Sequence, residues 1–190
     1  MKISLPFELG DPLYWVNFIK TETEVPDLAE AKKTDLRIHG FSCEADGKVF
    51  VKTDYDEYEE LGSQYALLSM QEAENWIDKN LPGAIRLDGR VVDAVYIDRC
   101  GEMSIRPVAL SMEELDALVS GKLVAGEPDV NGIFAIYNEF ARNSNKPVTR
   151  VTLDTNGRPV GVMFGEFLLL QLTPDRKGIQ NIDRKLFEEG

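Results

Sequence analysis

Residues 147–172 constrain the fold of this 190-residue chain more than any other stretch. The turn sequence Thr155-Asn156-Gly157 lies between two segments rich in apolar residues: Val148, Val151 and Leu153 before it, and Val160, Val162 and Phe164 after it. Asn-Gly adopts positive φ at low cost, as a tight hairpin turn requires. The run from Phe167 to Leu170 is too apolar to face water on both sides. The stretch therefore predicts two strands folded into a hairpin at a hydrophobic core.

Two capping boxes predict the main helices. In Ser69-Met-Gln-Glu72 the serine oxygen can accept a hydrogen bond from the backbone of the third helical residue, while the glutamate reaches back toward the cap. We expect a helix to about Asn80, ended by Pro82-Gly83. Ser111-Met-Glu-Glu114 repeats the signal, and Gly121 is placed to end that helix.

Most of the remaining segments predict strands. They are Leu13–Val16, a second hairpin of residues 36–41 and 48–53 around Ala45-Asp46-Gly47, and residues 90–97, 122–125 and 132–137. Pro26-Asp27 is interpreted as the start of a short helix, and residues 179–189 as a short terminal helix. The sum is an α+β protein rich in antiparallel strands, with a joint near residues 82–90.

Composition excludes some classes of protein. No apolar run reaches the roughly 18 residues that a membrane span needs. Residues 1–6 lack the apolar region and cleavage site of a secretory signal, so we expect no membrane association and a location in the host cell cytoplasm. Cys43 and Cys100 are expected to be free, buried thiols, and no metal or cofactor is expected.

The balance of charge bears on the kind of partner. The chain has 21 basic and 33 acidic residues, a net charge of -12. Lysine and arginine contacts to phosphate supply most of the affinity of proteins for nucleic acid, so direct nucleic-acid binding is not expected. A protein with a basic surface would be attracted instead, although acidity can also serve solubility alone.

The densest acidic cluster is the candidate partner-binding site. It comprises Asp54, Asp56, Glu57, Glu59 and Glu60, interleaved with Tyr55 and Tyr58. If these carboxylates share one edge, they can stand in for successive phosphates and occupy a channel lined by arginine and lysine. The alternatives are a solvated acidic loop, and a divalent-metal nuclease site built on Asp54, Asp56 and Glu57. No catalytic residue is assigned.

Residues 92–172 resemble an uncharacterised domain family found in accessory proteins of phages and mobile elements. The segments that carry the resemblance are Ala94-Val-Tyr-Ile97, Met112-Glu-Glu-Leu-Asp-Ala-Leu-Val-Ser-Gly121, Ile136-Tyr-Asn138, Asn145-Lys-Pro-Val-Thr-Arg150 and Gly165-Glu-Phe-Leu-Leu169. The loop before Pro147 is longer than the family pattern, and Val148-Thr149 replace its usual Pro-Asn. The resemblance implies no catalytic residue.

Near the N-terminus, Gly10-Asp11-Pro12-Leu13-Tyr14-Trp15-Val16 is similar to the SH3-like barrels that accompany such domains. The predicted organisation is therefore an SH3-like antiparallel barrel with one helix over residues 1–85, followed by a small α+β domain with a C-terminal β-hairpin over residues 86–190. The resemblance also implies a setting in which small acidic proteins block host defence nucleases. The leading hypothesis is a non-enzymatic inhibitor of the anti-CRISPR or anti-restriction type, and the alternatives are an interaction module without inhibitory role or the metal nuclease.

Overall fold

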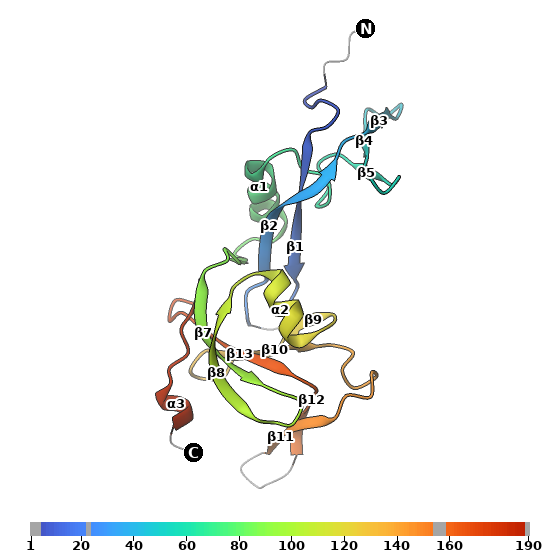
Figure 1. Cartoon of the computed structure of the whole chain (residues 1–190). Coiled ribbons are helices and arrows are strands. Elements are labelled where there is room, and N and C mark those ends of the chain that lie inside the picture. The colour runs from blue at the N-terminus through green and yellow to red at the C-terminus, as the bar shows by residue number, and fades with distance from the viewer. Residues whose placement is uncertain (1–4, 22–23, 154–158, 189–190) are drawn as a thin grey trace. The chain divides into compact units, whose positions relative to one another are not determined.

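The computed structural model describes residues 5–21, 24–153 and 159–188, and shows a mixed α+β protein made mostly of strands with few helices (Figure 1). The chain divides into two compact units. Unit 1 comprises Met1–Asn17 and Ala29–Ala84, and unit 2 comprises Phe18–Leu28 and Ile85–Gly190. The expected division into domains 1–85 and 86–190 stays a prediction, because compactness does not test independent folding.

Unit 1 contains an antiparallel meander of β3 (Gly40–Cys43), β4 (Val49–Lys52) and β5 (Tyr58–Glu60). The turn of the predicted second hairpin is confirmed: Cys43 pairs with Val49, and Gly47 adopts a φ of 91°. Its first strand was predicted too early, because residues 36–37 end the preceding strand and β3 begins at Gly40. A small core stabilises the unit, formed by Phe7, Leu13, Ile38, Val51 and Ala66.

The helix α1 (Met70–Asn80) follows the meander and begins as its capping box predicts. The Ser69 Oγ accepts a hydrogen bond from the Glu72 backbone N–H at 3.1 Å, and the Glu72 carboxylate accepts one from the Leu68 N–H at 2.8 Å. Ala73 and Ile77 are buried on one face, whereas Met70 is exposed.

Another sheet contains β1 (Pro12–Ile19), β2 (Leu28–Arg37) and β6 (Ile85–Arg86), in the order β1-β2-β6. The short helix predicted after Pro26-Asp27 is wrong, because Leu28–Arg37 pairs in this sheet despite its helix-favouring Ala, Glu and Lys residues. Both three-stranded sheets are open in the described residues, so the closed barrel expected in the N-terminal part is not present there.

Unit 2 is built on a six-stranded antiparallel sheet with the order β8-β7-β13-β10-β9, in which β14 also pairs with β13. Its strands are β7 (Val91–Ile97), β8 (Met103–Ala109), β9 (Leu123–Ala125), β10 (Ile133–Asn138), β13 (Phe167–Leu172) and β14 (Ile179–Gln180). The central strand β13 is the predicted apolar run, and Leu168 and Leu170 are fully buried.

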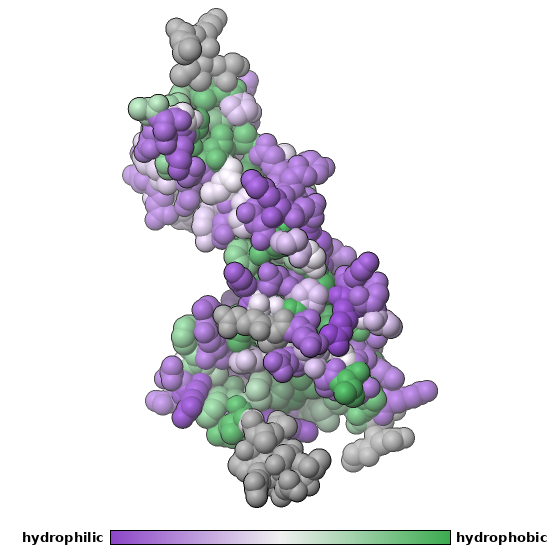
Figure 2. Space-filling view, turned by 180° about the vertical axis from the view of Figure 1, so that it is seen from behind, coloured by the Kyte–Doolittle hydropathy of each residue, from purple (hydrophilic) through white to green (hydrophobic). Residues whose placement is uncertain are grey.

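Register separates the two faces of this sheet. Tyr96, Leu168 and Ile136 are neighbours on the face that α2 (Met112–Val119) covers, together with Phe134 and Leu170. Figure 1 shows α2 lying across the sheet. On the opposite face Ile97, Phe167 and Tyr137 are neighbours, and Ile182 and Phe187 of the C-terminal segment pack there. That second face is only partly covered, and hydrophobic surface is visible over unit 2 in Figure 2.

The predicted hairpin exists as a two-stranded sheet of β11 (Val148–Leu153) and β12 (Pro159–Phe164), in which Val151 pairs with Val162. Its proposed turn, Thr155-Asn156-Gly157, lies outside the described residues. The strand is interrupted at Gly165 and Glu166. The next strand, β13, then joins the larger sheet instead of extending the hairpin. The terminal helix is limited to α3 (Lys185–Glu188).

Candidate functional site

The predicted partner-binding residues form what we call the acidic loop, residues 54–60, which connects β4 to β5 and includes β5. Lys52 pairs with Tyr58 at the ends of the two strands. Between them the Thr53 N–H donates to the Glu57 carbonyl at 3.1 Å, and the Asp56 N–H donates to the Thr53 carbonyl at 3.1 Å. Asp56 has a φ of 61°, which Asp tolerates better than most residues because its side chain can hydrogen-bond locally. Local hydrogen bonds therefore shape the loop.

Asp54 attaches the acidic loop to the segment before β3. One carboxylate oxygen accepts a hydrogen bond from the Arg37 backbone N–H at 2.8 Å, and the other pairs with His39 Nε2. The Arg37 N–H and the His39 side chain lower the pKa of Asp54. Both oxygens already have partners, so this carboxylate positions the loop.

Two more carboxylates form ion pairs with lysines of the same unit. Lys52 Nζ lies 2.5 Å from Asp56, and Lys48 Nζ lies 3.2 Å from Glu60. The hydrogen bond and the charge of Lys52 lower the pKa of Asp56, whereas Asp56 raises the pKa of Lys52. Among the described residues, only Glu57 and Glu59 of the five predicted carboxylates lack both an ion pair with a lysine and a contact with His39. The free charge of the cluster is therefore smaller than its sequence indicates.

The strand pleat also separates the cluster. Alternate residues of a strand point to opposite faces, so Tyr58 and Glu60 share one face. Glu59 lies on the other face, next to its cross-strand partner, the buried Val51. Hence the carboxylates do not form one continuous row along a single edge. The sequence could not show this, because it depends on the position at which the turn ends and β5 begins.

Exposed aromatic rings are the second component of the acidic loop. Tyr55 is 75% exposed and Tyr58 53% exposed, which is unusual for large side chains in a folded unit. By contrast Tyr14 and Trp15 are half-buried in β1. The loop thus presents two tyrosines and the Glu57 carboxylate to solvent.

The described residues contain no group of three or more His, Cys, Asp or Glu side chains placed to hold a metal ion, so Asp54, Asp56 and Glu57 do not form one there. Cys43 and Cys100 are free but exposed, so their predicted burial is wrong: Cys43 lies on the short strand β3 and Cys100 in the turn after β7. In the part of the chain described, no helix is long and apolar enough to cross a membrane.

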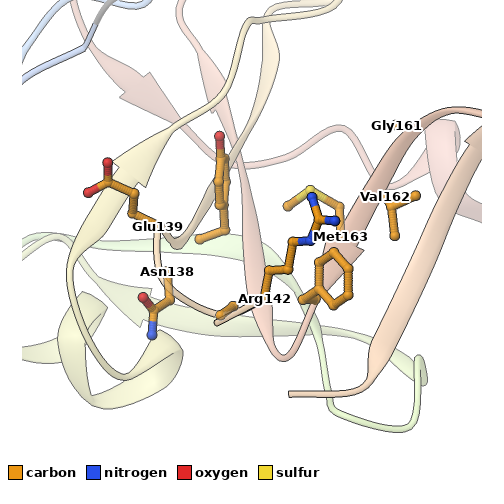
Figure 3. Close-up of a pocket in the computed structure, with 9 residues that line it drawn as sticks. Asn138, Glu139, Arg142, Gly161, Val162 and Met163 are labelled. Carbon is orange, nitrogen blue, oxygen red and sulfur yellow. The ribbon is translucent and has the colours of Figure 1, made fainter. Parts of the chain in front are cut away.

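Sequence reasoning missed a cleft in unit 2 with a volume of about 480 Å³. Residues of the β10 end and the following loop line one side, and β12 lines the other (Figure 3): Tyr137, Asn138, Glu139, Ala141, Arg142, Gly161, Val162, Met163 and Phe164. The sequence showed only a polar loop at 138–146, because nothing in it indicates that β12 folds back toward this loop.

Comparisons with known proteins give no further assignment. No protein-family model, no curated protein and no solved structure matches the chain.

Proposed function

We propose that this chain is a non-enzymatic inhibitor that binds a basic surface of another protein, of the kind that holds nucleic acid in a bacterial defence nuclease. The observation that carries the proposal is the acidic loop, in which the highly exposed Tyr55 and Tyr58 flank carboxylates. Exposed tyrosines supply much of the binding energy at protein interfaces. Unit 1 has 7 basic and 14 acidic residues, a net charge of -7, which favours encounter with a cationic partner.

The contacts within unit 1 determine which loop residues are available to bind a partner. Asp54, Asp56 and Glu60 would have to exchange their present partners to contact a cationic residue of a target, so they contribute less than a free carboxylate. Tyr55, Tyr58 and Glu57 carry the contact in this proposal. These residues would therefore contact the target through two aromatic rings and one carboxylate, and not through a row of carboxylates that replace successive phosphates.

The proposal also includes an origin for the chain. Membership of residues 92–172 in the family of phage and mobile-element accessory proteins would place the chain in the cytoplasm of an infected bacterium. Inhibition of an anti-CRISPR or anti-restriction type suits that setting.

The test uses bacteria that carry a defined CRISPR or restriction system and are infected with a targeted phage. Expression of the chain should raise the number of plaques. The triple variant Tyr55→Ala, Glu57→Lys, Tyr58→Ala should weaken binding at least about thirtyfold, if the tyrosines act as interface hot spots, and abolish the effect. The control Tyr65→Ala with Glu127→Lys alters exposed residues outside the acidic loop and should leave protection intact.

Equal protection by the triple variant and the parent chain would show that the acidic loop is not the site. A module without inhibitory role is favoured by the neutralised carboxylates. It would be recognised by a partner that co-purifies with the chain and loses no activity on binding. Cleavage of labelled RNA or DNA by the purified chain, dependent on Mg²⁺, would instead establish the nuclease.

A further inference from the structure

The cleft of unit 2 is chemically unlike the acidic surface of the rest of the chain. Its walls combine apolar side chains with polar ones, and Tyr137, Met163 and Phe164 are partly buried while Val162 is 44% exposed. A volume of about 480 Å³ lies within the range of sites that hold a few side chains or a small ligand. A cleft of this size with a mixed lining can bury apolar surface of a ligand and use its polar groups for orientation.

Only one charged group of this lining is uncompensated among the described residues. The Asn138 amide is engaged, donating to the Ser120 carbonyl and accepting from the Phe140 N–H. The Glu139 carboxylate lies 2.6 Å from Lys122 Nζ. Arg142 has no acidic partner in the described part of the chain, and Figure 3 shows it beside Met163. The cleft therefore presents a positive charge in a chain whose net charge is -12.

The backbone of β12 supplies the second element of the site. β12 pairs with β11 along one edge, and Gly161 to Phe164 face the cleft. The backbone hydrogen bonds of the described residues outside the β11–β12 ladder include none from residues 161–164. An unpaired strand edge offers alternate N–H and C=O groups to another extended chain. Gly161 carries no side chain, so an added strand can approach the backbone closely there.

Arg150 adds a second cation to the same ribbon. It is exposed and pairs in register with Met163, and cross-strand partners point to the same face. Arg150 therefore lies on the same face of the ribbon as Met163, and Arg142 lies beside Met163 in the cleft (Figure 3). This charge pattern is complementary to a peptide in which acidic residues alternate with apolar ones.

We propose that the cleft binds an extended acidic peptide segment of a partner protein, which adds to β12 as a third strand, inserts an apolar side chain between Tyr137 and Met163, and pairs a carboxylate with Arg142. The partner is a protein because the proposed mode of binding uses both backbone pairing with a strand edge and insertion of an apolar side chain. This inference is independent of the proposed function. It concerns unit 2 and an acidic partner, whereas the proposed function concerns unit 1 and a basic partner.

The test measures fluorescence anisotropy of labelled heptapeptides with the full chain. A peptide that alternates Glu and Leu should bind saturably, and one that alternates Lys and Leu should bind at least about tenfold more weakly. Arg142→Glu should weaken the Glu–Leu peptide at least about tenfold. Lys177→Glu makes the same change of charge at an exposed site of unit 2 away from the lining residues, and should alter binding less than about twofold.

Two further measurements test the mode of binding. In an extended Glu–Leu peptide the N–H groups of the Glu residues point to one edge and those of the Leu residues to the other. Methylating the backbone nitrogens of all Glu residues, or of all Leu residues, therefore blocks the donors of one edge only. Only one of the two methylated peptides should lose binding. Hydrogen exchange at residues 161–164 should slow when the peptide is bound. Equal loss with Arg142→Glu and Lys177→Glu, equal binding of both methylated peptides, or protection only outside the cleft would overturn the proposal. So would a dimer of the chain that the Glu–Leu peptide dissociates, because the occupant would then be a second copy.

Discussion

Replacing Glu166 with Gln removes one charge from a buried carboxylate while keeping its shape. Glu166 is 4% exposed at the start of β13. It accepts two hydrogen bonds from Arg99, each at 3.1 Å, and lies 3.4 Å from Lys146 Nζ. Lys146 also donates to the Val119 carbonyl at 3.2 Å, at the end of α2. This cluster therefore joins β13, the turn after β7, the α2 terminus and the segment before β11.

The cost of the substitution follows from what each partner loses. Removing one member of a fully buried pair costs about 3–5 kcal/mol, whereas an exposed pair contributes about 0–1 kcal/mol. The Arg99 side chain is 66% exposed and can be hydrated, while the Lys146 side chain is 15% exposed and keeps its carbonyl partners. We therefore expect Glu166→Gln to lower the free energy of unfolding by about 1–3 kcal/mol, between those limits.

The assay can separate the two units because both tryptophans, Trp15 and Trp76, belong to unit 1. In urea, tryptophan fluorescence follows unit 1 and hydrogen exchange in β7 and β13 follows unit 2. Glu166→Gln should shift the second signal, and the first signal stays unchanged if the two units unfold independently. Glu127→Gln, an exposed glutamate of the same unit, should leave both unchanged.

The effect should also depend on pH. Burial raises the pKa of Glu166, but the Arg99 hydrogen bonds and the Lys146 charge lower it more, so the pKa lies below the ordinary value of 4.5. A lowered pKa in the folded state gives stability that is present above pH 4.5 and is lost as the pH falls through the folded value. The difference between parent and variant should shrink below pH 4.5. A difference under about 0.5 kcal/mol at pH 7, or one that does not change with pH, would refute the reasoning.

Two other substitutions test local features. Ser69→Ala removes the α1 N-cap and should lower the stability of unit 1 by about 1 kcal/mol in tryptophan fluorescence. Ser42→Ala on β3 is the control, and equal effects would contradict the capping role. Gly121→Ala places a Cβ 2.3 Å from the Asn138 side-chain nitrogen at a φ of 120°, and should cost unit 2 about 1–3 kcal/mol. Gly126→Ala meets no atom closer than 3.6 Å, and a similar loss there would show that the strain argument fails.

Features decided by neighbouring residues were predictable from the sequence. Both helices begin at their capping boxes, because a serine oxygen and an N–H three residues later meet whatever the rest of the chain does. The turn at Asp46-Gly47 is equally local. By contrast β8 was not predicted, since Pro107 interrupts its pattern. The structure places β8 at the edge of the sheet, where a missing N–H is tolerated.

The candidate sites show the same limit. The composition of the acidic loop could be read from the sequence, but the contacts of Asp54, Asp56 and Glu60 with His39, Lys52 and Lys48 follow from strand register. The Arg142 cleft and the buried Glu166 cluster had no sequence signal, because their members meet across up to 67 positions of the chain.

The sequence by itself therefore determined the α+β class, the two capped helices, the apolar strand β13 and the acidic character of the chain. Only the tertiary structure decided the order of the strands, the neutralisation of the acidic loop and the position of an uncompensated Arg142 beside β12. The physical reason is that hydrogen bonds between near neighbours depend on a few residues, whereas burial and charge pairing depend on which distant segments the whole chain brings together.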